Sequence, residues 1–223
     1  MFWRMRMKLR SSHVLCKVAD ISAAVRDFTG QGFTVTWGSR PDKAHNALLW
    51  FPEGPFVELF ELPARAAVLR WPVGLRYGAP AGQRIAAWAR SAPGWADLAL
   101  ETDAQHLRAE YAELSRLDLP VSRILKGRRT NPDGSKVGYQ FLAPAPAGLP
   151  FIVSSYDPPQ RPAEIAHPNG AKSVARIRFG VAAQDRAGLE ALIGPDPWLD
   201  VVPAEQTGVQ SVELNGAQFA GGL

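Results

Sequence analysis

The sequence predicts an α+β fold built from two tandem βαβββ modules and a partial third β-α-β-β unit. Two observations support this prediction. Strand-like alternation and helix-like hydrophobic spacing follow one another in a fixed order, and that order returns in the second half of the chain. The chain has 223 residues, of which 46% are hydrophobic and 21% charged, so it is large enough to bury a sizeable core.

The first module is expected at residues 12–62. Residues 13–18 alternate, which places His13, Leu15 and Lys17 on one face of a strand. Asp20 is expected to cap the following helix by accepting hydrogen bonds from its first free amides. The other elements expected here are a helix from residue 21 to a glycine at 30 or 32, and strands at 33–37, 46–51 and 56–62.

The rest of the chain is expected to contain a connector, a second module and a tethered partial unit. The connector, residues 63–93, is predicted to hold one helix at 83–90, and Asp103 is expected to cap the helix of the second module. The partial unit is expected to pack on the outside or to cover a sheet edge. The predicted strands of the second module, residues 94–157, lie at 95–100, 121–125, 136–142 and 150–156. After a proline-rich tether, the partial unit within residues 158–223 is predicted to have strands at 174–181, 198–202 and 209–214 and a helix at 185–193.

The composition and the N-terminal segment indicate which classes of protein the chain is not expected to belong to. Residues 1–11 are expected to be a disordered leader, because no apolar segment of a secretory signal follows the basic start. No apolar run is long enough to span a membrane, and Cys16 is the only cysteine, which favours a reducing cytoplasm. The net charge is +4, but no basic stripe with stacking aromatics predicts nucleic-acid binding. The densest basic cluster, Lys126 with Arg128 and Arg129, is either a solvated surface or part of a pocket for an anionic small molecule.

Several segments together resemble the glyoxalase-like branch of the vicinal-oxygen-chelate superfamily. Residues 13–20, 23–28 and 32–35 are similar to the opening of such a domain, where a histidine on the first strand leads into a helix and a Gly-Phe turn. Residues 45–48 and 56–59 resemble its third and fourth strands, and residues 94–103, 157–159 and 167–171 resemble its second half. The resemblance implies a curved mixed sheet around a cleft, and a monomer or homodimer that binds a small molecule.

The resemblance also implies a possible metal site. Metal-dependent relatives use His and Glu ligands on the first and last strands of each module, which suit Zn, Fe, Mn or Ni. The first module supplies His13 and Glu58, so one divalent metal is possible. In the second module Ala96 and Val153 take the corresponding positions, and Asp97 is expected to face the other side of its strand. A site with no cofactor at all therefore stays open as the alternative.

Metal-free chemistry is the alternative use of the same residues. His13 is expected to act in proton transfer, with Glu58 orienting it and raising its pKa, and Lys17 is expected to stabilise an enolate or carboxylate. His167 is expected to hold a loop. Three functions stay open: an enzyme of lyase, isomerase or dioxygenase type acting on a small oxygen-bearing metabolite, a metal-free binding or resistance protein, and a catalytically inactive accessory protein whose paired sheets serve as an interaction surface. The residues expected to contact the small molecule are His45, Asn46, Trp50, Phe60, Tyr139 and Ser155.

Overall fold

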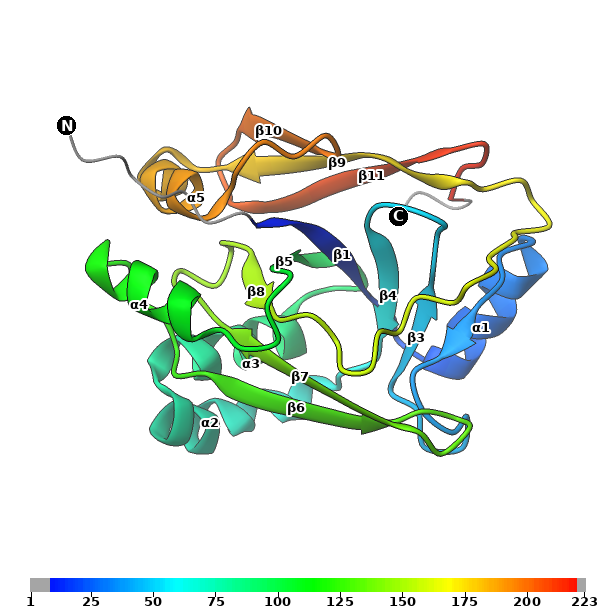
Figure 1. Cartoon of the computed structure of the whole chain (residues 1–223), viewed down its shortest axis with the longest axis horizontal. Helices are drawn as coiled ribbons and strands as arrows, with labels where there is room; N and C mark the ends of the chain where they lie inside the picture. The colour runs from blue at the N-terminus through cyan, green and yellow to red at the C-terminus, as the bar shows by residue number, and fades with distance from the viewer. Residues whose placement is uncertain (1–8, 220–223) are drawn as a thin grey trace.

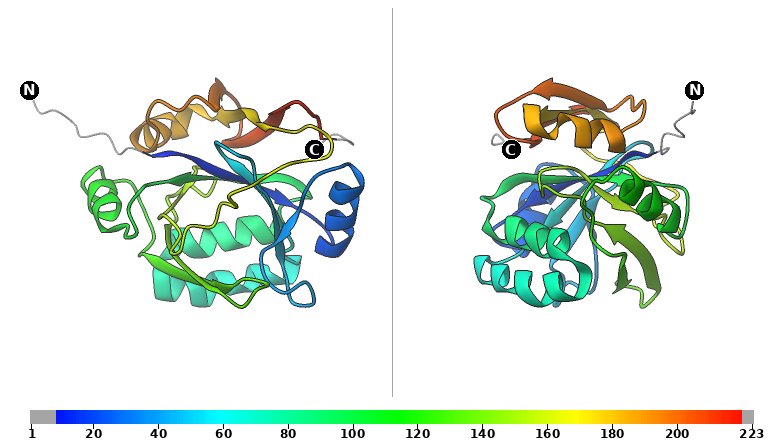
Figure 2. Two further views of the ribbon diagram at one scale, coloured as in Figure 1. Left: turned by 45° about the vertical axis from the view of Figure 1, so that its right-hand side comes forward. Right: turned by 90° about the vertical axis from the view of Figure 1, so that its left-hand side faces the viewer.

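Two sheets form the framework of the computed structural model, which describes residues 9–219. An eight-stranded mixed sheet in the order β2-β3-β4-β1-β5-β8-β7-β6 curls into a half-barrel, and a three-stranded sheet in the order β10-β9-β11 lies over it (Figure 1). The helices of the connector lie on the side of the large sheet opposite the three-stranded sheet, as Figure 2 shows. The predicted α+β fold, with paired modules around a curved sheet, is confirmed.

The first module has the predicted order of elements. Asp20 caps α1, since its carboxylate accepts a hydrogen bond of 2.7 Å from the amide of Ala23. Residues 33–35, the start of the strand predicted at 33–37, are not in a strand. The amide and hydroxyl groups of Thr34 bind His167 and Ala166 instead of pairing with a neighbouring strand. The elements are β1 (Arg10–Lys17), α1 (Ile21–Gly30), β2 (Thr36–Trp37), β3 (Asn46–Leu49) and β4 (Phe56–Phe60).

The connector contains more helix than predicted. A 3-10 helix (Ala64–Leu69) leads into α2 (Arg70–Tyr77) and α3 (Ala79–Arg90), whereas the sequence predicted only residues 83–90 of α3. The helix α2 has no buried residue and contains Pro72 and Gly74. Its sequence therefore lacks the apolar periodicity from which a helix is predicted.

In the second module two predictions are wrong. The helix α4 begins at Arg108 after an N-cap at Leu107, and Asp103 instead forms an ion pair with Arg10 at 2.9 Å. The strand expected at 121–125 is displaced, because Val121 makes only an isolated bridge and β6 starts at the last residue of that segment. The elements are β5 (Gly94–Glu101), α4 (Arg108–Arg116), β6 (Leu125–Thr130), β7 (Lys136–Leu142) and β8 (Phe151–Val153).

The partial third unit covers the outer face of the large sheet. Val14 and Leu98, from β1 and β5, share one hydrophobic core with Ile177 and Phe179 of β9. The unit therefore packs on the outside of the sheet, which is one of the two placements that were expected. Its elements are β9 (Ser173–Val181), a 3-10 turn (Ala183–Asp185), α5 (Arg186–Leu192), β10 (Leu199–Pro203) and β11 (Gly208–Asn215).

Most of the predicted leader, residues 1–8, lies outside the described residues, while Arg10 and Ser11 already belong to β1, so the prediction of disorder is wrong for these two. Between residues 9 and 219, none of the helices is long and apolar enough to cross a membrane.

Candidate functional site

A cavity of about 320 Å³ lies on the inner face of the curled sheet, between the two modules. Its volume is at the lower end of the range for small-molecule sites. One side, which we call the apolar wall, consists of Leu15, Phe60, Phe141, Phe151 and Val153. The other lining residues are His13, Gly38, Ser39, Lys43, His45, Asn46, Glu58, Trp88, Arg129, Tyr139 and Tyr156.

His13 and Glu58 meet in this cavity, as the sequence predicted. The strands β1 and β4 run parallel, with His13 opposite Phe56 and Leu15 opposite Glu58. Alternation then turns both side chains to the inner face. His13 Nε2 lies 3.5 Å from Glu58 Oε2.

Glu58 is held at one oxygen and open at the other. Asn46 Nδ2 donates a hydrogen bond of 2.8 Å to Glu58 Oε1. Gly38 makes room for this amide, because a Cβ at position 38 would collide with the Asn46 side chain. Burial raises the pKa of Glu58, and the Asn46 hydrogen bond and the charge of Arg129 oppose that rise. The carboxyl group is therefore a candidate for proton transfer.

His13 is held between rings and a hydroxyl group. Its ring stacks on Phe56, with 4.6 Å between centroids, and meets the edge of Phe151. Its Nδ1 lies 3.1 Å from Ser12 Oγ. Burial lowers the pKa of His13 to about 3, and the charge of Arg129 adds to this effect. The expectation of a raised pKa for His13 is wrong, because burial and the charge of Arg129 both lower it.

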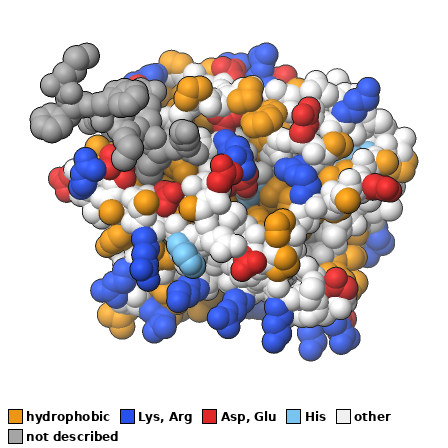
Figure 3. Space-filling view, viewed as in Figure 1, with side chains coloured by type: hydrophobic (Ala, Val, Ile, Leu, Met, Phe, Trp, Pro, Cys, Tyr) orange, Lys and Arg blue, Asp and Glu red, His pale blue; other side chains and the backbone are white. Residues whose placement is uncertain are grey.

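The second module adds a cation, Arg129, which the sequence placed in a basic cluster on either a solvated surface or a pocket for an anionic small molecule. Basic side chains gather along the lower edge of the molecule in the view of Figure 3. On β6 Lys126 and Arg128 are exposed, whereas Arg129 is partly buried and lines the cavity. The alternation of β6 distinguishes Arg129 from its exposed neighbours. The sequence prediction did not use it, because it placed the strand at 121–125.

Arg129 has unused hydrogen-bonding capacity. Its Nη2 donates to Gln160 Oε1 at 3.2 Å, while its buried Nε has no hydrogen-bond partner among residues 9–219. Within the same residues, no carboxylate forms an ion pair with it. A guanidinium group in this state can bind an anion with two donors.

Two tyrosines stand beside Arg129. Tyr139 was predicted, Tyr156 was not, and their rings lie 5.4 Å apart. Burial and the charge of Glu58 raise the pKa of both phenols, so both stay protonated and can donate hydrogen bonds. Gly127 makes room for the ring of Tyr139, because a Cβ at position 127 would collide with it.

The structure separates the other predicted site residues into two groups. His45, Asn46 and Phe60 line the cavity, and exposed His45 lies at its mouth with Lys43. Lys17, Trp50 and Ser155 are not among its lining residues.

The three residues outside the cavity have structural contacts instead. The ammonium group of Lys17 donates to the carbonyl groups of Ala89 and Ser91, at 2.8 and 2.7 Å, at the end of α3. Trp50 packs behind Phe56, with 4.0 Å between ring centroids. Ser155 donates its backbone amide to the carbonyl oxygen of Ala104.

The residues of the cavity do not fit a resident metal ion. Among residues 9–219, His, Cys, Asp and Glu form no group of three that could hold one. His13 and Glu58 supply two donors, and the guanidinium group of Arg129 shares their cavity. Two protein donors beside a cation are a poor set for a transition metal, which usually has three or four.

The second module explains the missing donors. Ala99 faces Phe151 on parallel strands as His13 faces Phe56, so Ala99, and not the predicted Ala96, occupies the position equivalent to His13. The error followed from aligning Asp103 with Asp20, since Asp103 does not cap a helix. Val153 takes the position of Glu58, as predicted.

Asp97 differs from expectation as well. A β-bulge in β5 lets Asp97 pair with Leu15, which turns its side chain to the inner face. There it binds Arg84 and Trp88, and so it does not serve as a third ligand.

Solved structures resemble this architecture. A hypothetical protein from Staphylococcus aureus is 13% identical, with a TM-score of 0.64 over 95% of this chain and 93% of that one. A methylmalonyl-CoA epimerase from Streptomyces coelicolor, solved as a point variant in complex with 2-nitronate-propionyl-CoA, is 16% identical over 67% of this chain and 98% of that one. Its TM-score is 0.40. No curated protein sequence matches the chain significantly.

The sequence comparison with protein families gives a match that spans most of the chain. The family described as "Glyoxalase-like domain" matches residues 12–192, which include both modules and every lining residue of the cavity. The chain therefore belongs to the glyoxalase-like domain family.

Proposed function

We propose that the chain binds a small carboxylate in the cavity and transfers a proton to or from its carbon skeleton, with Glu58 as the acid–base group and no resident metal. One observation supports this proposal above the others. A partly buried carboxyl group with one open oxygen shares the cavity with a guanidinium group that lacks an ionic partner among residues 9–219.

Arg129 is the proposed anchor of the carboxylate. Its unused Nε and its position among the lining residues favour an anion there. The low dielectric constant of a cavity walled by Phe60, Phe141 and Phe151 strengthens such a contact. The apolar wall accommodates the hydrocarbon part of the ligand.

Glu58 is the proposed acid–base group. A general base must lie within reach of the proton that it removes, and the open Oε2 faces the cavity. The phenol groups of Tyr139 and Tyr156 stay protonated, so they are suitable donors to an oxygen on which negative charge develops. Together these groups favour the isomerase type of reaction over a redox reaction.

The proposal is tested with 2-oxo and 2-hydroxy acids that have apolar side chains. Ligand-observed NMR measures binding, and the same samples in D₂O report exchange of carbon-bound protons above the rate without protein. We expect binding and exchange with and without a chelator. Failure of all these acids to bind, or exchange that a chelator abolishes and added metal restores, contradicts the proposal.

Binding without exchange of carbon-bound protons would favour the alternative function. In that case the cavity would serve a binding or resistance protein, which the apolar wall and the incomplete donor set among residues 9–219 also favour. Exchange in the wild type that Glu58→Gln removes would instead exclude the binding protein, because a protein that only binds has no exchange to lose.

A further inference from the structure

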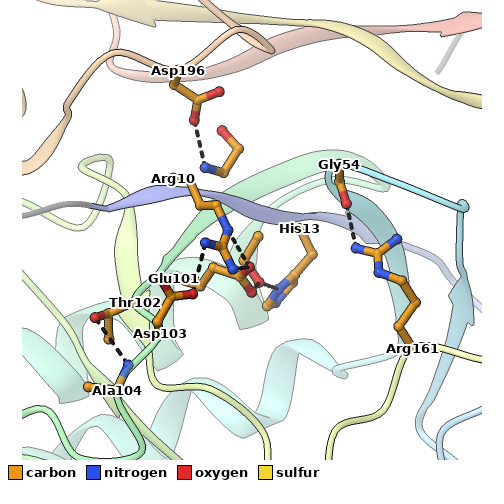
Figure 4. A network of polar contacts seen from close by, with 11 residues as sticks. Arg10, His13, Gly54, Glu101, Thr102, Asp103, Ala104, Arg161 and Asp196 are labelled. Carbon is orange, nitrogen blue, oxygen red and sulfur yellow. Dashed lines mark hydrogen bonds and ion pairs between the residues drawn. The ribbon is translucent and has the colours of Figure 1, made fainter.

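A row of hydrogen bonds joins the cavity to the surface through Ser12. Ser12 Oγ lies 3.1 Å from His13 Nδ1 and donates a hydrogen bond of 2.9 Å to Glu101 Oε2. Arg10 binds the other oxygen of Glu101 at 2.9 Å. Figure 4 shows Arg10, His13 and Glu101 gathered below β1. None of Ser12, Glu101 and Arg10 lines the cavity.

A β-bulge brings Ser12 to this position. In the ladder between β1 and β5, Ser11 pairs with Leu100 and His13 pairs with Ala99, so Ser12 is an extra residue. In a regular strand Ser12 would face the side opposite His13, and a bulge re-aims such a side chain. The backbone amide of Ser11 binds Asp196 Oδ2 at 2.6 Å, so the third unit stabilises the bulge.

The direction of these hydrogen bonds determines which ring nitrogen of His13 has the proton. A serine hydroxyl has one proton, and Ser12 donates it to the carboxylate of Glu101. Ser12 Oγ must then accept from His13, so Nδ1 is protonated. Nε2 of the neutral ring is left with its lone pair, 3.5 Å from Glu58 Oε2.

We infer that Ser12 and Glu101 are positioning residues that hold His13 as the Nδ1–H tautomer, so that its Nε2 accepts a hydrogen bond from the hydroxyl group of a small hydroxy acid. The acid part of this ligand class rests on the function proposed above. The hydroxyl part rests on the hydrogen bonds of His13. With Nε2 and the carboxylate of Glu58 both accepting, a ligand that brings a proton donor fits this end of the cavity and one without a donor leaves both acceptors unmet.

His167 provides an internal reference with the opposite tautomer. Its Nδ1 accepts from the amide of Thr34 at 2.9 Å, so its Nε2 has the proton and donates to the carbonyl group of Trp50. This arrangement agrees with the expected role of His167 in holding a loop. The two buried histidines should therefore give opposite patterns in one spectrum.

The tautomer is measured by ¹⁵N NMR of protein labelled at its 4 histidines, with the His13 signals identified by their loss in His13→Gln. We expect wild-type His13 to be protonated at Nδ1 and His167 at Nε2. Ser12→Ala and Glu101→Met should shift His13 towards Nε2–H. The first removes the acceptor of the Nδ1 proton, and the second frees the Ser12 proton to turn towards Nδ1. Nε2–H can then donate to Glu58.

Two further variants separate positioning from general disturbance. Ser12→Thr keeps the hydroxyl group and should restore the wild-type pattern. Asp103→Asn removes the other carboxylate that binds Arg10 and should leave the pattern unchanged. Wild-type His13 protonated at Nε2, or an unchanged pattern in both Ser12→Ala and Glu101→Met, would overturn the role of these residues.

The hydroxyl group is tested with mandelate and phenylacetate, which differ by that group alone. Wild-type protein should bind mandelate about three- to tenfold more tightly, the effect of one net hydrogen bond, and Ser12→Ala should lose this preference. Equal affinities overturn the hydroxy-acid class and leave the proposed carboxylate site intact. Failure of both acids to bind contradicts the carboxylate site, and with it the acid part of this class, while the tautomer spectrum still decides the role of Ser12 and Glu101.

Discussion

Each half of the large sheet has a carboxyl group on its inner face, partly buried Glu58 on β4 and buried Asp97 on β5. Both oxygens of Asp97 are held by protein donors: its Oδ2 accepts from Arg84 at 2.5 Å and from Trp88 at 2.7 Å, and its Oδ1 accepts from the amide of Leu98. Glu58 has one donor, Asn46, and its second oxygen faces His13 and the cavity.

The two groups show how a carboxylate used in packing differs from one that is available to a ligand. Burial raises the pKa of both groups, so the direction of the pKa shift does not distinguish them. The number of donors does. Asp97 joins α3 to β5, whereas Glu58 keeps an oxygen for a ligand.

The largest effect is expected from Asp97→Ala. This change leaves Arg84, which is 1% exposed, without its ionic partner. The free energy of unfolding should fall by about 3–5 kcal/mol, the usual cost of an unpaired buried charge, as measured by urea denaturation. Asp103→Ala is the control, since Asp103 pairs with Arg10 at the surface. A loss below that of the control would show that Asp97 is not structural.

Glu58→Gln should change the reaction and not the stability. The amide side chain keeps an acceptor for Asn46 and loses the ability to take up a proton. Exchange of carbon-bound protons should slow by about 100-fold or more, with ligand affinity nearly unchanged, as NMR in D₂O measures. The exposed Glu205→Gln is the matched control. A variant that exchanges at the wild-type rate would place the reactive group elsewhere.

Arg129→Met tests the anchor from the second module. Losing a charge-assisted hydrogen bond to the carboxylate should weaken binding by about 10- to 100-fold, equivalent to about 1.5–3 kcal/mol. Calorimetric titration with mandelate measures this. Arg128→Met, on the exposed face of the same strand, should bind like the wild type. Equal weakening in both variants would indicate a general effect of charge.

The smallest effect concerns pH. The pKa of His13 is near 3 in the folded protein, against an ordinary value of 6.5, so the unfolded chain takes up the proton first as the pH falls. His13 thus contributes stability above pH 6.5 that is lost towards pH 3, about 2 kcal/mol of it between pH 7 and 5.

The comparison of wild type with His13→Gln isolates that contribution from Glu58, whose raised pKa acts in the opposite direction. Urea denaturation at several pH values should show a smaller loss of stability in acid for the variant, with His106→Gln, changed at an exposed histidine, as control. Identical pH profiles for wild type and His13→Gln would mean that His13 is not buried in its neutral form.

Local patterns predicted the first module well, because its elements follow from neighbours in sequence. Alternation placed His13 and Glu58 on the inner face, and Asp20 marked the start of α1. The second module was harder. The wrong cap at Asp103 misaligned the second module with the first. Because the strand was predicted at 121–125, the inward position of Arg129 on β6 was not predicted.

The β-bulges could not be predicted from the alternation of side chains along a strand. Ser12 and Asp97 both face the inner side because an extra residue interrupts the alternation of β1 or β5. Lys17 obeys the alternation, but the end of α3 binds its ammonium group, a contact between residues far apart in sequence. Sequence patterns thus predicted the pair at the centre of the site, and long-range packing determined its surroundings.

The contact of Lys17 with α3 has a consequence for selectivity. A single strand, β1, holds His13 at the cavity and fastens the helix that supplies Trp88 to the same cavity. The spacing between these two sides is therefore set by one rigid element, and size selection there would be strict. The tolerant side of the molecule is the mouth, where exposed Lys43 and His45 belong to the segment that joins β2 to β3. Variation in ligand preference among relatives should accordingly follow that segment more than the strands.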